Sequence, residues 1–151
     1  MNHEIHEIHE RTEFSDLVEV RAPAEEYDSL IYRDETYLIQ GAVFEVYREI
    51  GYGFLESVYQ ECMETEMSER GIPFEAQKEL PLYFKKKLLQ KTFKPDFVCF
   101  GKIILELKAV KEIIEEHRAQ LFNYLRASRF RLGLLVNFGH HPKATVERII
   151  L

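Results

Sequence analysis

The stretch KPDFVCFGKIILELKAV, residues 94–110, constrains the fold more than any other part of the sequence. Two short apolar runs flank a Gly101-Lys102 turn, a pattern that predicts two neighbouring strands. Asp96, Glu106 and Lys108 nevertheless lie within or beside these apolar runs. Burying a charged group costs free energy, so three charges at these positions need a physical reason.

The alternation of side chains along a strand decides which of these charges can meet. Glu106 and Lys108 share one face of the second strand, while Leu107 points to the other face. A two-residue turn would place Asp96 opposite Leu107, on the wrong face. A three-residue connection, Phe100 to Lys102, would instead pair Asp96 with Glu106. We therefore expect the odd-length connection or an equivalent bulge.

Two carboxylates that converge on one point repel each other, and a divalent cation relieves that repulsion most simply. Oxygen ligands without His or Cys favour Mg²⁺ or Mn²⁺ over zinc. Lys108, one pleat away, would orient a water molecule and stabilise negative charge that develops on a phosphate. Such a site suits phosphodiester hydrolysis. The alternative is an ordinary exposed strand face with a Glu106-Lys108 pair, because the E-x-K spacing is common.

The remaining periodicity predicts an α/β domain with two helices, three strands, a helix and two further strands in chain order. The pattern turns Leu38, Leu55 and Ile114 towards the core. We expect helices over residues 35–50, 54–70 and 112–127, and strands over residues 74–85, 91–100, 103–110, 131–139 and 146–151, with a lysine-rich turn between the first two strands.

Charge is distributed unevenly along the chain. Residues 1–36 carry eleven acidic side chains against three arginines, a charge of −8 within a total of −6. We therefore divide the chain into an acidic leader, residues 1–33, that is flexible or docked on a partner, and a domain over residues 34–151. Nine lysines face only three acidic residues between positions 78 and 111, and such a basic surface can bind phosphates.

The predicted nucleic-acid-binding residues are lysines of this basic stretch: Lys78, Lys85, Lys86, Lys87, Lys91 and Lys94. The alternative is that these lysines only solubilise a hairpin tip or an edge strand. No apolar run approaches the roughly 18 residues that cross a bilayer, and the amino terminus is acidic where a secretory signal is basic. We expect a cytoplasmic protein without a membrane partner, and we expect Cys62 and Cys99 to be reduced.

Several motifs together resemble a known enzyme superfamily. Asp96 in KPDF, followed by ELK at 106–108, resembles the signature of the PD-(D/E)XK nucleases. GFLESVY, residues 53–59, resembles the GxxExxY pattern that names a prokaryotic family assigned to that superfamily, and QLFNYL and GLLVNFG resemble its downstream blocks. The resemblance covers about residues 35–151 and leaves the leader outside. It implies a three-layer α/β fold of the PD-(D/E)XK nuclease type, with a mixed central β-sheet flanked by helices.

The resemblance also implies roles for individual residues. Asp96 and Glu106 would be metal ligands for Mg²⁺ or Mn²⁺, and Lys108 would be the catalytic lysine. Glu56, on the helix before the sheet, would be an additional acid near the metal, and the alternative for it is an exposed helical glutamate.

Gln120 and Tyr124 resemble the Q-x-x-x-Y element of RecB-like nucleases, whose side chains lie beside the active site. Their spacing places both on one helical face, and the alternative is boundary packing. Gln77 falls where the family tends to carry glutamine. His117 could face the same cleft, although a solvated helical histidine is the simpler interpretation.

The leading functional hypothesis is a metal-dependent nuclease that hydrolyses phosphodiester bonds in DNA. The alternative is a non-catalytic accessory module that binds nucleic acid or protein on a nuclease fold. The acidic leader could cover the basic groove or bind a protein partner, so removing residues 1–33 should raise nucleic-acid affinity at low salt. Homodimerisation would suit an enzyme that cuts two strands. RNA as the substrate and the choice between endo- and exonuclease action stay open.

Overall fold

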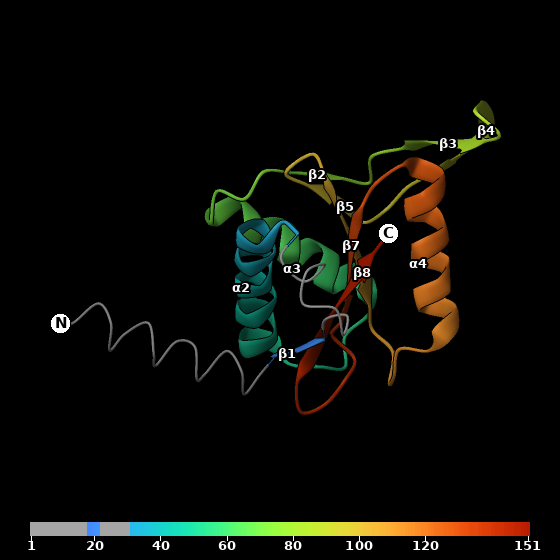
Figure 1. Ribbon diagram of the computed structural model, residues 1–151. Helices are drawn as coiled ribbons and strands as arrows, with labels where there is room; N and C mark the ends of the chain where they lie inside the picture. Colours follow the sequence, from blue (N-terminus) through green and yellow to red (C-terminus); the bar gives the residue numbers. More distant parts are fainter. Residues whose placement is uncertain (1–17, 22–30) are drawn as a thin grey trace.

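A mixed β-sheet with helices on both faces forms the centre of the protein (Figure 1). The structure is a computed structural model that describes residues 18–21 and 31–151. The described helices are α2 (Arg33–Ile50), α3 (Glu56–Glu69) and α4 (Glu115–Ser128). The strands are β1 (Val18–Arg21), β2 (Phe74–Ala76), β3 (Leu80–Phe84), β4 (Lys87–Phe93), β5 (Phe97–Cys99), β6 (Ile103–Lys108), β7 (Leu132–Asn137) and β8 (Ala144–Ile150).

The main sheet contains six strands in the order β1-β8-β7-β6-β5-β2. β6 pairs with β7 in parallel and β1 with β8 in parallel, while the other neighbours are antiparallel. β3 and β4 form a separate two-stranded hairpin, which projects beyond one end of α4 in Figure 1. The predicted α/β fold with a mixed central sheet is confirmed.

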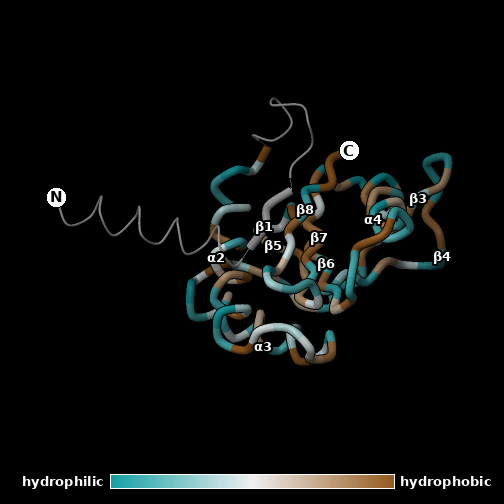
Figure 2. The backbone as a smooth tube through the Cα atoms, turned by 90° about the horizontal axis from the view of Figure 1, so that it is seen from below, coloured by the Kyte–Doolittle hydropathy of each residue, from teal (hydrophilic) through white to brown (hydrophobic). Residues whose placement is uncertain are grey.

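Two hydrophobic cores lie on opposite faces of this sheet. Figure 2 shows the hydrophobic strand β7 between α2 and α3 on one side and α4 on the other. In β6, Leu105 and Leu107 belong to the core under α2 and α3, whereas Ile104 belongs to the core under α4. Because side chains alternate along a strand, Glu106 and Lys108 share the α4 face with Ile104.

The predicted strand over 74–85 is wrong in its continuity, because Gln77 interrupts it. Gln77 has a φ of 56°, which ends β2 and redirects the chain into β3. The predicted strand over 91–100 is also divided, into β4 and β5, because Pro95 has no N–H to donate to a ladder. The predicted lysine-rich turn reduces to Lys85 and Lys86, since Phe84 already pairs with Lys87.

Three apolar side chains that were expected inside are exposed, namely Leu38, Leu55 and Ile114. Leu38 and Ile39 both fit the helical period of α2, and packing selects Ile39 for the core. Leu55 precedes the first helical residue of α3. Ile114 likewise precedes α4, and its neighbour Ile113 is buried instead. Periodicity alone therefore does not choose between neighbouring positions such as Leu38 and Ile39. It also fails just before a helix begins, where the backbone is not yet helical.

The predicted boundary at residue 33 remains a prediction. Residues 1–17 and 22–30, where most of the acidic leader falls, lie outside the described residues. Within the leader, β1 pairs with the outer edge of β8, with Val18 opposite Ala144. In the described parts of the chain, no helix has both the length and the apolar character required to cross a bilayer.

Candidate active site

The connection between β5 and β6 sets the register on which the site depends. Cys99 pairs with Ile103 and Phe97 with Leu105, so the predicted three-residue connection is confirmed. Phe100 and Gly101 both have positive φ, and Lys102 N donates to the carbonyl of Cys99 at 3.1 Å. Continuing this register beyond the last ladder pair brings Asp96 level with Glu106.

Two hydrogen bonds between backbone and side chain connect Asp96 with Glu106 and Leu107 of β6. The backbone N–H of Asp96 donates to Oε1 of Glu106 at 3.1 Å. Oδ2 of Asp96 accepts the N–H of Leu107 at 2.7 Å. Because Pro95 ends the regular pairing, these side chains replace the ladder hydrogen bonds that are missing there. One carboxylate oxygen of each acidic residue, Oδ1 and Oε2, takes no part in these two hydrogen bonds.

The electrostatics of this pair are unusual for carboxylates. Burial raises the pKa of Glu106 to about 8, with the charge of Asp96 as the next cause. Burial is also the main reason that the pKa of Asp96 is raised, and the charge of Glu56 adds to it. Lys108 lowers both pKa values, but its effect is smaller than that of burial. The protein alone therefore leaves negative charge at this point incompletely compensated.

A small cavity of about 120 Å³ brings Glu106 together with Lys108, Gln120 and Tyr124, whereas Asp96 and Glu56 do not line it. It is lined by Phe93, Glu106, Lys108, His117, Gln120, Leu121, Tyr124 and Leu135. Gln120 and Tyr124, which their four-residue spacing puts on one face of α4, thus lie beside Glu106 and Lys108. The ring of Tyr124 stacks on Phe93 at 4.1 Å, which connects the cavity to the base of the β3–β4 hairpin.

His117 also lines this cavity, and its ring is oriented by its own helix. Its Nδ1 accepts the backbone N–H of Ile114 at 3.1 Å, within the cap at the start of α4. In the neutral ring the proton therefore resides on Nε2. His117 is only half-buried, so the structure gives it both a capping role and a place at the cavity.

Glu56 and Gln77 influence the carboxylate pair from outside the cavity. Glu56, the first residue of α3, raises the pKa of both Asp96 and Glu106 through its charge. The backbone N–H of Gln77 donates to the carbonyl of Asp96 at 3.1 Å, and hydrogen bonding from its side chain lowers the pKa of the Asp96 carboxyl, with a smaller effect than burial. Among residues 18–21 and 31–151, no three acidic, His or Cys side chains come close enough to form a ready-made metal cluster.

Two further residues position the site, and sequence reasoning missed both. Gln60 Nε2 donates to the carbonyl of Asp96 at 3.3 Å, and its spacing from Glu56 on α3 was a usable signal. Asn137 Oδ1 accepts the N–H of Val110 at 3.1 Å, and its Nδ2 donates to the carbonyl of Val110 at 2.8 Å. This buried amide fixes the chain just after Lys108.

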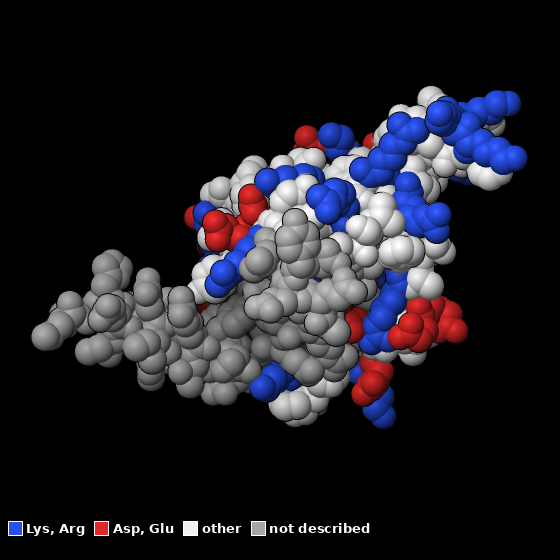
Figure 3. Space-filling view, in the orientation of Figure 1, with Lys and Arg blue, Asp and Glu red and all other residues white. Residues whose placement is uncertain are grey.

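The predicted nucleic-acid-binding lysines are all exposed, but they are not equivalent. Lys78 pairs with Glu75 at 2.8 Å. Lys85, Lys86, Lys87 and Lys91 belong to the β3–β4 hairpin, and Figure 3 shows blue side chains gathered over this hairpin. Lys94 lies between β4 and Asp96, and it links the hairpin to the carboxylate pair along the chain.

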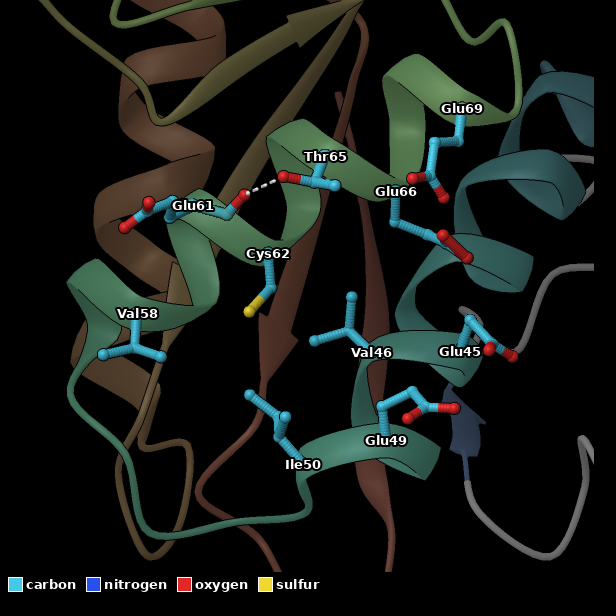
Figure 4. A pocket seen from close by; sticks show the side chains of 10 residues that line it. All are labelled: Glu45, Val46, Glu49, Ile50, Val58, Glu61, Cys62, Thr65, Glu66 and Glu69. Atoms are coloured by element: carbon cyan, nitrogen blue, oxygen red, sulfur yellow. Dashed lines mark hydrogen bonds between the residues drawn. The ribbon is translucent and has the colours of Figure 1, made fainter.

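A larger groove, about 430 Å³, lies between α2 and α3 and contains none of the predicted site residues (Figure 4). Its floor is apolar, with Val46, Ile50, Val58 and Cys62. Five glutamates also line it: Glu45, Glu49, Glu61, Glu66 and Glu69.

Comparison with known proteins agrees with the fold. A family model described as PD-(D/E)XK nuclease superfamily matches residues 33–149. The chain belongs to the PD-(D/E)XK nuclease superfamily. The predicted three-layer fold of this superfamily is therefore confirmed. The matched region contains every residue of the candidate site.

A solved structure described as "Crystal structure of SSO0001" resembles this PD-(D/E)XK domain with a TM-score of 0.50 and 15% sequence identity. The similarity covers 81% of this chain and 58% of that chain, so the chain spans little more than half of the solved relative. At this identity the likeness supports the fold alone. No curated protein matches the sequence.

Proposed function

We propose that this PD-(D/E)XK domain is a divalent-metal-dependent nuclease that hydrolyses phosphodiester bonds in DNA. The observation that carries the proposal is the pair of carboxylates formed by Asp96 and Glu106. Burial raises the pKa of both groups, and Lys108 lines the same cavity as Glu106. A protein gains no stability from such a pair on its own, because both groups resist ionisation there. A cation that binds both carboxylates would reverse this penalty.

The donor set fits Mg²⁺ or Mn²⁺. Oδ1 of Asp96 and Oε2 of Glu106 are the oxygens that remain outside the two hydrogen bonds between backbone and side chain. Hard oxygen donors suit these ions, and Mg²⁺ usually keeps several water molecules and needs only one or two carboxylates. The absence of a three-residue cluster among the described residues is compatible with that requirement. We propose Glu56 as a third, weaker source of negative charge for the ion.

When bound, such an ion polarises the scissile phosphate and lowers the pKa of a bound water. Lys108 would hold the attacking water in position and donate hydrogen bonds to the negative charge that develops on the phosphate oxygens. Gln120 and Tyr124 would orient the substrate backbone from the α4 side of the cavity, since both side chains line it. Hydrogen bonding from Gln77 would orient the Asp96 carboxyl and offset a small part of the effect of burial on its pKa.

The exposed lysines would bind the DNA backbone. Lys85, Lys86, Lys87, Lys91 and Lys94 extend from the hairpin tip towards the carboxylate pair, and phosphate contacts of this kind supply sequence-independent affinity. Lys78 is the weakest of these candidates because it pairs with Glu75. We assign the chain to the GxxExxY family within the superfamily as part of the same proposal, on the GFLESVY motif.

The test is a cleavage assay on single-stranded DNA, double-stranded DNA and RNA with Mg²⁺, Mn²⁺ or a chelator. Asp96→Ala and Lys108→Ala should lose cleavage, while Lys111→Ala, an exposed lysine just beyond β6, should keep it. Calorimetry should detect a divalent ion that binds the wild type and is lost in Asp96→Ala. If the wild type neither cleaves nor binds the ion, the nuclease proposal is wrong and the accessory-module alternative takes its place.

A further inference from the structure

The β3–β4 hairpin exposes apolar side chains that a solubilising arm would not need. Phe84 is 62% exposed and Leu88 66% exposed, and both lie beside the turn. The turn consists of Lys85 and Lys86, with φ values of 47° and 65°. Left-handed backbone is costly for residues other than glycine, and tight hairpins usually place Asn or Gly there. A strained turn with exposed apolar neighbours indicates a contact surface.

The charge of the hairpin selects the kind of partner. Residues 80–95 contain five lysines and no acidic residue. All five lysines are exposed, and within the described part of the chain none of them forms an ion pair with a carboxylate. The ammonium of Lys85 lies 5.7 Å from the centre of the Phe84 ring. The tip of the hairpin therefore exposes an aromatic ring close to several lysines. This combination suits a polyanion that also contains aromatic rings, such as the bases of a nucleic acid.

The base of the hairpin is fixed to the candidate active site. Leu80, Leu82 and Phe93 are buried in the same core as Leu121 of α4, and Phe93 lines the cavity with Glu106. Further out, the guanidinium of Arg129 lies 4.0 Å from the ring centre of Tyr83. A two-stranded hairpin is marginal on its own, so these contacts with α4 are what hold the arm in place.

We propose that this hairpin binds an unpaired stretch of nucleic acid and leads it to the cavity. The lysines would contact phosphates, and Phe84 would stack on a base, the combination used by proteins that bind single strands. Bases of an intact duplex already stack on each other, so the exposed ring would favour single-stranded or frayed substrates. The inference rests on the proposed nuclease function and adds to it the substrate class and the element that selects it.

The test measures binding separately from cleavage, on the full chain carrying Lys108→Ala in Mg²⁺. Fluorescence anisotropy with a labelled single strand and with its matched duplex should show about tenfold or greater preference for the single strand. Adding Phe84→Ala should weaken single-strand binding about tenfold, the usual effect of one stacked base, and change duplex binding less than twofold. Leu38→Ala, a change at an exposed apolar residue of α2 on the opposite side of the sheet from α4, should change neither.

A second variant tests the lysines. Replacing Lys85, Lys86 and Lys87 with Gln should reduce the slope of log affinity against log salt by about 2 for single strands. Equal binding of strand and duplex, or single-strand binding that Phe84→Ala leaves unchanged, overturns the inference. Hairpin-dependent binding to anionic lipid vesicles with none to DNA would assign the arm to a membrane surface and overturn it too.

The two proposals fail differently. If the protein cleaves DNA but does not prefer single strands over duplex, the proposed role of the hairpin is wrong and the nuclease proposal stands. Hairpin-dependent binding by a chain that never cleaves removes the nuclease and leaves the hairpin as a nucleic-acid-binding arm.

Discussion

Carboxylates line both the cavity beside α4 and the groove between α2 and α3, but the pKa of Glu106 in the cavity and the pKa of Glu45 in the groove shift in opposite directions. In the larger groove, Arg48 donates to Glu45 at 2.7 Å and holds the pKa of that carboxyl below its usual range. Beside the smaller cavity, burial raises the pKa of Glu106 to about 8. The volume of a cavity is therefore a poor guide to its chemistry in this protein. The raised pKa values of the buried carboxylates are the better guide, because they indicate where we propose that a cation and a phosphate bind.

The difference follows from where each carboxylate is attached. The groove glutamates stand on helix surfaces, where arginines three or four residues away can pair with them, as Arg70 does with Glu66 at 3.3 Å. Asp96 directly precedes β5 and lies level with Glu106 on β6, and there burial outweighs the nearby charge of Lys108. Pairs such as Glu66 and Arg70 are typical of a solvated surface, and they contribute little to stability.

The largest expected effect concerns activity. Glu106→Gln keeps the size of the side chain and removes its charge, and we expect at least a 100-fold loss of Mg²⁺-dependent cleavage. Glu66→Gln, the matched change in the groove, should leave the rate within twofold of the wild type. Single-turnover cleavage rates under saturating enzyme measure both. Similar losses in the two variants would mean that the comparison between the two regions is wrong.

An intermediate effect concerns the dependence of stability on pH. Because the folded-state pKa of Glu106 is about 8, above its usual value of 4.5, folding favours the protonated carboxyl. The stability that this group contributes is complete below about pH 4.5 and is lost as the pH rises through 8. The raised pKa of Asp96 acts in the same direction. We therefore expect the free energy of unfolding in chelator to fall between pH 5 and 8.

Urea unfolding at several pH values measures this dependence. Glu106→Gln should flatten it, because the amide does not titrate, whereas Glu61→Gln in the groove should leave the slope unchanged. A wild-type protein whose stability rises over the same range would contradict the assigned direction of the shift.

The smallest expected effect concerns the two thiols. Burial and the charge of Glu61 raise the pKa of Cys62, which lines the groove, and burial raises the pKa of Cys99 in the core to about 12. Because the thiolate is the reactive form, a thiol reagent at pH 8 should modify Cys62 slowly and leave Cys99 unmodified. Glu61→Gln should speed the reaction of Cys62 about twofold. Faster modification of Cys99 than of Cys62 would refute this order.

The sequence by itself determined the strand faces around the carboxylate pair and identified the residues that line the cavity with Glu106, although it missed Gln60 and Asn137. Alternation along β6 placed Glu106 beside Lys108, and the odd length of the connection after Cys99 brought Asp96 level with Glu106. The four-residue spacing of Gln120 and Tyr124 put both on one side of α4. These features are local, because the backbone geometry of a strand or helix fixes side-chain direction from residue spacing alone.

Only the tertiary structure decided how strongly the site is charged and what surrounds it. Burial of Glu106 depends on the packing of α4 against the sheet, and no spacing in the sequence reports it. The divided strands at Gln77 and Pro95 free the β3–β4 hairpin from the main sheet, and stacking of Phe93 on Tyr124 then attaches it to the cavity. Desolvation and contacts between distant segments arise from the whole fold. A sequence pattern therefore identifies the charged residues but not the free-energy cost of burying their charges.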